Sequence, residues 1–285
     1  MSIQTLKGVI SRRIHQKVAQ QVSCCEVSCC ELRFQERTCL ARPLRLLSYN
    51  IQVGINTEQY RHYVTRGWQH VLPHSERMGN LDRVATLLPD FDLVALQEVD
   101  GGSLRSGFVN QTEYLALKGR FPFWYQQLNR NFGKIAQHSN GFLSRVKPLI
   151  LEDHKLPGLI PGRGALMAEF GLPEKPVLIV MMHLALSKRT RNIQLSYIRE
   201  RIQGYEHVVL MGDMNTHANQ LLNDSPLKHT SLLPSSSQGH TFPSWRPKLS
   251  LDHILVSPSL TVKAVSVLKV PISDHLPVAV EVALP

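Results

Sequence analysis

Several apolar runs of this chain stop abruptly at polar residues. The run 208–211 is followed by Gly-Asp-Met-Asn, which places Asp213 and Asn215 directly after it. An apolar run of this length is typical of a strand that is buried on both faces. Alternate residues of a strand point to the same side. We therefore expect a buried sheet with Asp213 and Asn215 on one side of its rim, in a polar turn or in an active site.

Five other predicted strands also carry an amide, an acid or an imidazole at one end. Strands 44–50, 92–98 and 177–183 end on such residues, and such residues also start strand 251–256 and precede the last strand. They are Asn50, Gln97, Glu98, His183, Asp252, His253, Asp274 and His275. Taken singly, each of these residues has an ordinary structural explanation, as a turn residue, a solvated strand end or a hydrogen-bonded core histidine. Six such coincidences are less probable than one shared site.

The segments between these strands predict the fold class. Helices are expected at 80–88, 111–118 and 187–203, separated by strand-like runs. Asn80 and Ser187 are the predicted N-caps of the first and last of these helices. Leu195, Ile198 and Ile202 are expected to form the buried apolar stripe of the last one. Strands interspersed with amphipathic helices favour an α/β sandwich, with the sheets inside and the helices outside. At 285 residues and 43% hydrophobic content, the chain can bury a large core.

Residues 1–42 differ from the rest of the chain. This segment is basic and contains all five cysteines, Cys24, Cys25, Cys29, Cys30 and Cys39. Their C-C-x3-C-C spacing is not that of a zinc ribbon, although adjacent cysteines could bind a soft metal or accept an acyl chain. The stretch 6–22 could form a short basic helix that contacts a membrane surface or a partner. We expect 1–42 to be a disordered tail and 43–285 to be one domain.

The net charge of +10 and the pI of about 9.6 favour an anionic partner. Nucleic acid, an anionic membrane and a phosphorylated substrate all satisfy this condition, and charge does not choose among them. No apolar run approaches the ~20 residues that a transmembrane helix needs. We therefore predict a cytoplasmic protein, with peripheral membrane contact as the alternative. A monomer is expected, although no sequence feature reports the oligomeric state.

The polar motifs occur in a specific order, Y-N, Q-E, N-G-F-L-S-R, H-L, G-D-M-N, L-D-H-I and S-D-H. This order resembles the endonuclease/exonuclease/phosphatase superfamily, which has the DNase-I-like fold. The resemblance covers about 43–285. It implies a four-layer α/β sandwich of two packed mixed β-sheets flanked by helices. It also implies Mg²⁺- or Mn²⁺-dependent cleavage of a phosphodiester.

The resemblance, together with residue chemistry, predicts the metal ligands and the base. Hard divalent ions take oxygen ligands, and the candidates here are Glu98, Asn50 and Asp274. His275 is the predicted general base, because imidazole titrates near neutral pH. The resemblance implies that Asp252 orients it.

Four further residues receive roles in phosphate chemistry. Asp213 is predicted to align the attacking water, and Asn215 to donate to a phosphoryl oxygen as charge builds there. His183 is expected to stabilise the phosphate or to protonate the leaving oxygen. Asn140 is expected to contribute another hydrogen bond at the phosphate or at the metal site.

Basic residues are predicted in loops at the rim of this site or at the start of a nearby helix. They are Arg105, Arg163, Lys188, Arg189 and Arg191. They could bind a nucleic-acid backbone or a phospholipid head group, so nucleic acid and a phospholipid- or glycolipid-like ester both stay open as substrates. A catalytically inactive binding module on the same fold is the competing hypothesis. It is disfavoured because every acid and imidazole that the chemistry needs is present.

Two positions and one run depart from known members of the superfamily. Gln52 stands where some nucleases carry an acid, which removes a ligand for a second metal ion. His183 stands where AP endonucleases carry a tyrosine, which argues against that activity. Trp245 alone matches the W-C-D-R-I-like run of inositol 5-phosphatases. The runs at 104–107 and 161–166 instead resemble bacterial members whose substrate is unassigned.

Overall fold

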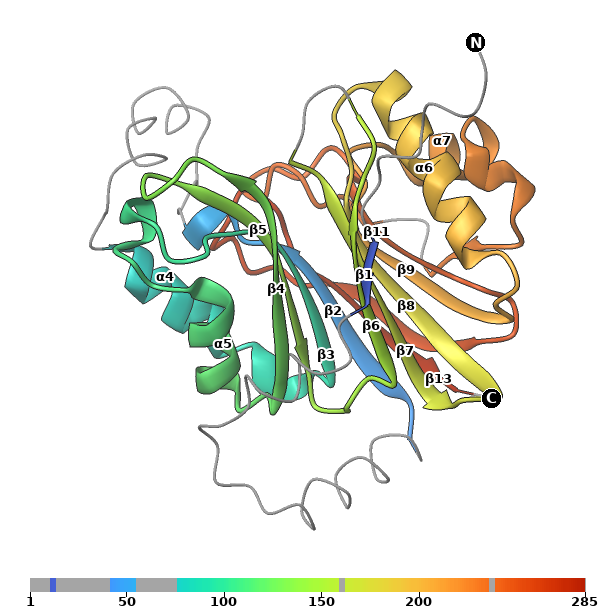
Figure 1. Cartoon of the computed structure of the whole chain (residues 1–285), viewed down its shortest axis with the longest axis horizontal. Coiled ribbons are helices and arrows are strands. Elements are labelled where there is room, and N and C mark those ends of the chain that lie inside the picture. Colours follow the sequence, from blue (N-terminus) through green and yellow to red (C-terminus); the bar gives the residue numbers. More distant parts are fainter. Residues whose placement is uncertain (1–10, 14–41, 55–75, 159–161, 236–238, 285) are drawn as a thin grey trace.

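The computed structural model describes residues 11–13, 42–54, 76–158, 162–235 and 239–284. Two β-sheets pack against each other, and helices cover both outer faces (Figure 1). This arrangement confirms the predicted four-layer α/β sandwich.

One sheet has seven strands and the other has six. The first contains, in spatial order, β1 (Ser11–Arg13), β6 (Ile150–Lys155), β7 (Gly164–Leu172), β8 (Lys175–His183), β9 (His207–Asp213), β11 (Asp252–Val256) and β10 (Leu233–Pro234). The second contains β12 (Thr261–Val267), β13 (Val278–Ala283), β2 (Leu44–Asn50), β3 (Leu93–Val99), β5 (Gln137–Ser144) and β4 (Phe123–Asn131).

Each sheet contains one parallel pair of strands, and these pairs bring polar ends together. β2 runs parallel to β3, and β8 runs parallel to β9. Parallel strands end at the same edge of a sheet, so each pair places two chain ends side by side. As a result Asn50 is in register with Gln97, and His183 is in register with Asp213.

Helices α4 (Glu76–Ala85) and α5 (Gln111–Gly119) cover the six-stranded sheet, and α6 (Lys188–Ile202) and α7 (Ala218–Asn223) cover the other (Figure 1). Short 3₁₀ turns are η2 (Gln52–Gly54), η4 (Leu88–Asp90), η5 (Leu104–Ser106) and η6 (Pro226–His229). The predicted cap of α6 is confirmed, because the Ser187 hydroxyl accepts from the backbone N–H of Thr190 at 3.3 Å. Asn80 is not a cap. It lies inside α4, where its amide donates to the Gly54 carbonyl at 3.1 Å.

Three apolar layers hold the sandwich together. Phe142 and Ile179 belong to the layer between the sheets. Leu115 belongs to the layer under α5, and Leu195 and Ile198 belong to the layer under α6. The predicted apolar stripe of α6 is thereby confirmed. Burial of these layers is the main stabilising contribution, at roughly 1.5–3 kcal/mol for each fully buried large side chain.

The N-terminal segment departs from expectation in one place. Ser11–Arg13 form β1, which pairs antiparallel with β6. The possible helix over 6–22 is therefore wrong at these residues. The cysteines lie outside the described residues, so a separate tail ending at residue 42 stays a prediction. In the described parts of the chain, no helix combines the length and the apolar character that crossing a bilayer requires.

Gly212 permits close contact between β8 and β9. Its φ is 144°, and a Cβ atom at this position would lie 1.9 Å from the Met182 carbonyl oxygen. We expect Gly212→Ala to lower the free energy of unfolding by about 1–3 kcal/mol or more. Urea unfolding measures the loss. Gly204→Ala is the matched control, because φ there is also positive at 96° but no atom lies within 4 Å. Equal losses in the two variants would show that the contact with β8 is unimportant.

Candidate active site

The Oδ2 oxygen of Asp213 is the centre of the polar cluster. Asn50 donates to it from Nδ2 at 3.2 Å. The Nε2 atom of His183 is 3.4 Å away, and the Nε2 atom of His275 is 3.9 Å away. All four residues are buried. The cluster therefore joins strand ends of both sheets with the loop before β13.

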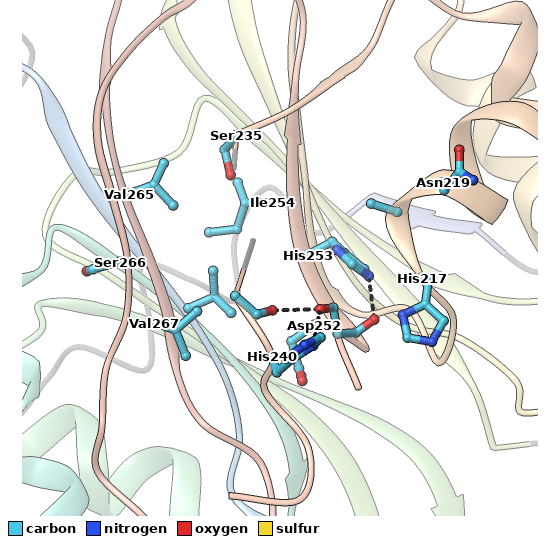
Figure 2. A pocket seen from close by; sticks show the side chains of 14 residues that line it. His217, Asn219, Ser235, His240, Asp252, His253, Ile254, Val265, Ser266 and Val267 are labelled. Carbon is cyan, nitrogen blue, oxygen red and sulfur yellow. Dashed lines mark hydrogen bonds between the residues drawn. The ribbon is translucent and has the colours of Figure 1, made fainter. Parts of the chain in front are cut away.

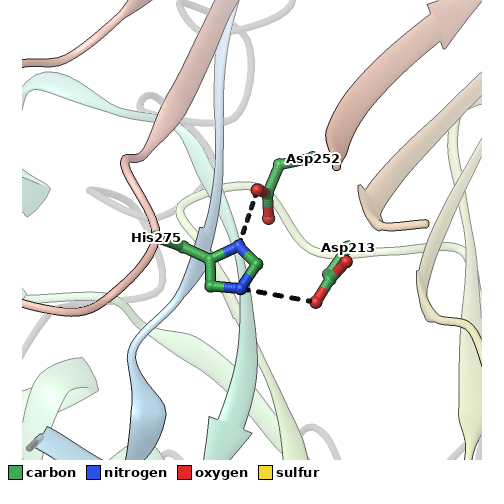
Figure 3. A group of neighbouring side chains, drawn as sticks. All are labelled: Asp213, Asp252 and His275. Carbon is green, nitrogen blue, oxygen red and sulfur yellow. Dashed lines mark hydrogen bonds and ion pairs between the residues drawn. The ribbon is translucent and has the colours of Figure 1, made fainter. Parts of the chain in front are cut away.

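His275 is held by a second carboxylate. Asp252 faces Asp213 across the β9–β11 ladder, and its Oδ2 lies 2.7 Å from Nδ1 of His275 (Figure 3). Since a carboxylate only accepts, Nδ1 carries the proton of this bond. The ring of Phe242 packs against the imidazole, with the two centroids 4.9 Å apart. These contacts fix the ring so that Nε2 is directed toward Asp213.

The net effect of burial and neighbouring charges is to raise the pKa values of both His275 and Asp213. Burial alone lowers the pKa of His275, but the Asp252 and Asp213 carboxylates raise it by more, so it lies well above 6.5. Burial, helped by Asp252 and opposed by His275, raises the pKa of Asp213 to about 7. The charges of Asp213 and His275 thus stabilise each other across the cluster.

His183 has the opposite character. Burial, then the charge of Arg163, lower the pKa of His183 well below 6.5, so this ring is neutral. The guanidinium of Arg163 lies against it, with Nη1 2.7 Å from Nδ1 and also in contact with Nε2. Arg163 therefore places a positive charge beside His183 in the site.

Glu98 reaches the same place through an irregularity in β3. Its φ is 55°, and the β3–β5 register shifts between Leu96 and Val99. Such bulges redirect side chains. The Glu98 carboxylate lies 3.9 Å from Nε2 of His183, and its side chain is 34% exposed. Desolvation of the partly buried carboxyl group, followed by the charge of Asp274, raises the pKa of Glu98.

The predicted metal ligands fit a hard divalent ion. Glu98, Asp274 and Asn50 offer carboxylate and amide oxygens, the donors that Mg²⁺ and Mn²⁺ prefer. The mutual repulsion of Glu98 and Asp274 is the kind that a cation relieves. Donor atoms of Asp213, Asp252 and His275 also lie within 4.8 Å of one another. The strong His275–Asp252 hydrogen bond makes that second group a less suitable metal cradle.

A pocket of about 560 Å³ opens beside the cluster. Glu98, Arg163 and His183 form part of its lining, and Asn140 contributes from β5. The Asn140 amide donates to Gln127 and to the Gly164 carbonyl, whereas its Oδ1 is buried without a partner among the described residues. Because His183 of the polar cluster and the neighbouring Glu98 both line the pocket, a substrate that reaches the cluster would occupy this pocket.

A different cavity, of about 480 Å³, has Asp252 in its lining (Figure 2). Its lining includes Asp252 with His217, His240 and His253. Of the predicted site residues, Asp252 alone lines this cavity. His253 is committed to the Thr216 and Ser250 carbonyls, at 2.7 and 3.0 Å. We therefore take the pocket at Glu98 as the substrate pocket.

The chain matches the Endonuclease/Exonuclease/phosphatase family over residues 47–275. It belongs to this family. Members of the endonuclease/exonuclease/phosphatase family are phosphoesterases. No curated protein sequence matches the chain.

Solved structures of the endonuclease/exonuclease/phosphatase family share the fold. A family protein from Beutenbergia cavernae has a TM-score of 0.67 at 20% identity, covering 85% of this chain and 72% of its own. The mannosyl-6-phosphatase Bt3783 of Bacteroides thetaiotaomicron has a TM-score of 0.60 at 19% identity, covering 85% and 100%. D. rerio TDP2, complexed with single strand DNA product, has a TM-score of 0.61 at 18% identity, covering 85% and 99%.

Two of the predicted substrate-binding arginines do not lie on the exposed rim. Arg105 is buried and forms an ion pair with Asp100, its Nε lying 2.8 Å from Oδ2. Arg191 is also buried and donates to the carbonyls of Ala185 and Leu186, at 3.2 and 2.8 Å. Their guanidinium groups therefore support the loops behind the pocket, and substrate binding by these two arginines stays a prediction. Arg163 does line the pocket.

The predicted role of Asn215 as a donor to the phosphate requires a side-chain N–H group that is not used within the protein. Its φ is 51°, and its amide donates from Nδ2 to the Leu184 carbonyl at 2.9 Å. The Asn215 backbone N–H donates to Asp213 at 2.9 Å. One hydrogen of the amide is thus used within the protein, and none of the described residues accepts the other.

Sequence reasoning missed residues that support the cluster from loops. Phe242 packs on His275, and the Thr241 hydroxyl accepts from the backbone N–H of Asp252 at 3.3 Å. The Ser273 hydroxyl donates to the Asn50 carbonyl at 2.7 Å. Ser273 stands next to the S-D-H motif and could have been found there. Phe242 and Thr241 lie in a Ser- and Pro-rich loop that carries no such signal.

Proposed function

We propose that this chain is a divalent-metal-dependent phosphodiesterase in which His275 activates the attacking water. The arrangement of His275 between two carboxylates carries the proposal. Asp252 binds Nδ1 at 2.7 Å, and Nε2 is directed toward Asp213 at 3.9 Å. A histidine whose one nitrogen is fixed by an acid, and whose other nitrogen faces the site, has the geometry of a general base.

The residues of the chain divide the reaction among them. His275 takes the proton of the water at Nε2, and Asp252 stabilises the imidazolium that forms. Asp213 accepts the second hydrogen of that water and aligns it. These roles require His275 to begin neutral, so activity should fall at low pH, where its raised pKa keeps it protonated.

The phosphate is bound by the opposite wall. Arg163 pairs with a phosphoryl oxygen, and Asn215 donates to it as negative charge develops. His183, held neutral beside Arg163, offers a hydrogen bond to the leaving oxygen. Asn140 adds a polar contact from the pocket wall.

Glu98, Asn50 and Asp274 would hold Mg²⁺ or Mn²⁺. When bound, the ion supplies positive charge that neutralises the phosphate and favours the deprotonated forms of nearby acids and imidazoles. Its identity, and the presence of one ion or two, stay open.

Nucleic acid and a phospholipid- or glycolipid-like ester remain the candidate substrates. The net charge of +10 favours an anionic substrate of either kind. Structural neighbours include a protein named for sugar phosphate chemistry and one solved with DNA, so they do not choose between the candidates. A steep fall of binding with salt would favour nucleic acid, because counterions are released. The cytoplasmic location and the monomeric state stay predictions.

Metal removal tests the proposal. We expect the chain to hydrolyse bis-p-nitrophenyl phosphate in Mg²⁺ or Mn²⁺, to lose turnover in EDTA, and to regain it with excess metal. Release of p-nitrophenolate gives the rate. Turnover that is indifferent to EDTA would overturn the metal assignment. Metal-dependent binding of oligonucleotides or lipid vesicles without hydrolysis of either would favour the inactive binding module.

A further inference from the structure

A buried ion pair lies directly behind the substrate pocket. The Asp100 side chain is 0% exposed and that of Arg105 is 3% exposed, with Nε and Oδ2 2.8 Å apart. Asp100 also accepts from the backbone N–H and the hydroxyl of Ser103, both at 2.7 Å. The Ser106 hydroxyl donates to it at 2.9 Å. Arg105 is therefore fixed, because leaving this position would strand a buried carboxylate.

Arg105 in turn determines the tautomer of His138, whose imidazole lines the pocket. Its Nη1 is 3.4 Å from Nε2 of His138, while its Nη2 donates to the Gln137 carbonyl at 2.9 Å. Arginine has only donors and stays charged, so Nε2 of His138 has to be the acceptor. The ring is then neutral and carries its hydrogen on Nδ1. Burial, followed by the charge of Arg105, lowers the pKa of His138 to about 4, in agreement with this tautomer.

The remaining N–H of His138, on Nδ1, bonds to none of the described residues. His138 lines the pocket together with Glu98 and His183. The two nitrogens of an imidazole point in divergent directions, so Nδ1 points away from Arg105. Within the described parts of the chain, no acceptor bonds to it. Phe132 packs edge-on against the ring, with centroids 6.0 Å apart and planes at 75°, which restrains its rotation.

We propose that His138 is a substrate-binding residue that donates its Nδ1–H to a neutral oxygen on the alcohol portion of the substrate. Asp100 and Arg105 are the positioning residues. The proposal rests on the phosphodiesterase function given above. A neutral acceptor is expected because Arg105 prevents His138 from becoming the cation that would attract a second anion. The nearby Ser187 and Thr190 also give the wall uncharged donors and acceptors. A hydroxyl, ether or carbonyl oxygen of a sugar or polyol has this chemistry.

Two substitutions separate binding from support. The amide nitrogen of asparagine can occupy the place of Nδ1, so His138→Asn keeps the donor and loses the Arg105 contact. The amide of glutamine occupies the place of Nε2, so His138→Gln keeps an acceptor for Arg105 and loses the donor. With thymidine 5′-(p-nitrophenyl phosphate) as the probe, we expect His138→Gln to raise KM about 3- to 10-fold at similar kcat. His138→Asn keeps the donor, so we expect it to raise KM by less than His138→Gln does.

The opposite order, or equal losses, would overturn the proposal, because the imidazole would then serve only to satisfy Arg105. A second measurement needs no turnover. Long-range ¹H–¹⁵N correlation spectra of histidine-labelled protein, assigned with His138→Gln, should show Nδ1 protonated and Nε2 unprotonated at neutral pH. The Nδ1 proton signal should shift when the same probe is added to His275→Ala. A protonated Nε2, or an unmoved signal, overturns the inference. A shifted signal in a chain without turnover supports it and rejects the phosphodiesterase function instead.

Discussion

Replacing His275 by alanine is expected to lower kcat by about 10²–10⁴-fold, the usual loss when a general base is removed. The substitution deletes the group between Asp252 and Asp213 and leaves no other imidazole bonded to Asp252 among the described residues. The rate of hydrolysis of bis-p-nitrophenyl phosphate in Mg²⁺ measures the loss. Circular dichroism establishes that the variant is folded.

His240→Ala is the control for this experiment. His240 lines the other cavity with Asp252, is exposed, and contacts Ser250 at 3.2 Å from Nδ1. We expect its removal to leave kcat within about twofold, since it bonds to no residue of the cluster. If His275→Ala were as active as His240→Ala, the assignment of the base would be wrong.

Replacing Asp100 by alanine is expected to lower the free energy of unfolding by about 3–5 kcal/mol, because it leaves the buried Arg105 charge without its partner. Several hydrogen-bond donors, from Ser103 and Ser106 among others, lose their acceptor at the same time. Urea unfolding at neutral pH measures the loss. Asp82→Ala is the matched control, because Asp82 pairs with Lys118 at 3.2 Å on an exposed surface. We expect little change there.

The Asp100 effect should depend on pH. Burial raises the pKa of Asp100, but hydrogen bonds from Ser103 and the charge of Arg105 lower it by more, so it lies below its ordinary value of 3.8. A lowered pKa contributes stability that is fully present above the unfolded pKa and is lost as the pH falls through the folded one. The difference between wild type and Asp100→Ala should therefore shrink in acid below about pH 4. A difference independent of pH would mean that the ion pair contributes little.

Most elements of the fold could be predicted because their signals are local. The apolar runs that became β2, β3, β8 and β9 need only a buried environment to form strands. The Ser187 cap and the apolar stripe of α6 follow from helix geometry within a few residues. The predicted cap at Asn80 was wrong because it also rested on a local signal alone. Asn80 has the chemistry of a cap, but packing against Gly54 places it within α4.

The candidate site could be predicted only as a set of residue types. Asn50, Asp213 and His275 stand out in the sequence as polar residues next to apolar strands, and the structure brings them together. Arg105 looked like a rim cation until its burial beside Asp100 became visible. Arginines that bind substrate and arginines that support loops look alike in a sequence. The two kinds of arginine differ in their binding partners, which are residues distant along the chain in one case and the substrate in the other.

The sequence by itself determined the strands, the helix stripe and the polar ends of the strands, since these depend on hydrophobic periodicity over a few residues. Tertiary structure decided which ends meet and in which protonation state. The parallel pairing of β8 with β9 sets His183 beside Asp213, and the bulge with φ 55° turns Glu98 toward them. The raised pKa of Asp213 and the tautomer of His138 arise from burial and from neighbouring charges. Those neighbours come from other strands and loops, so no local pattern encodes them.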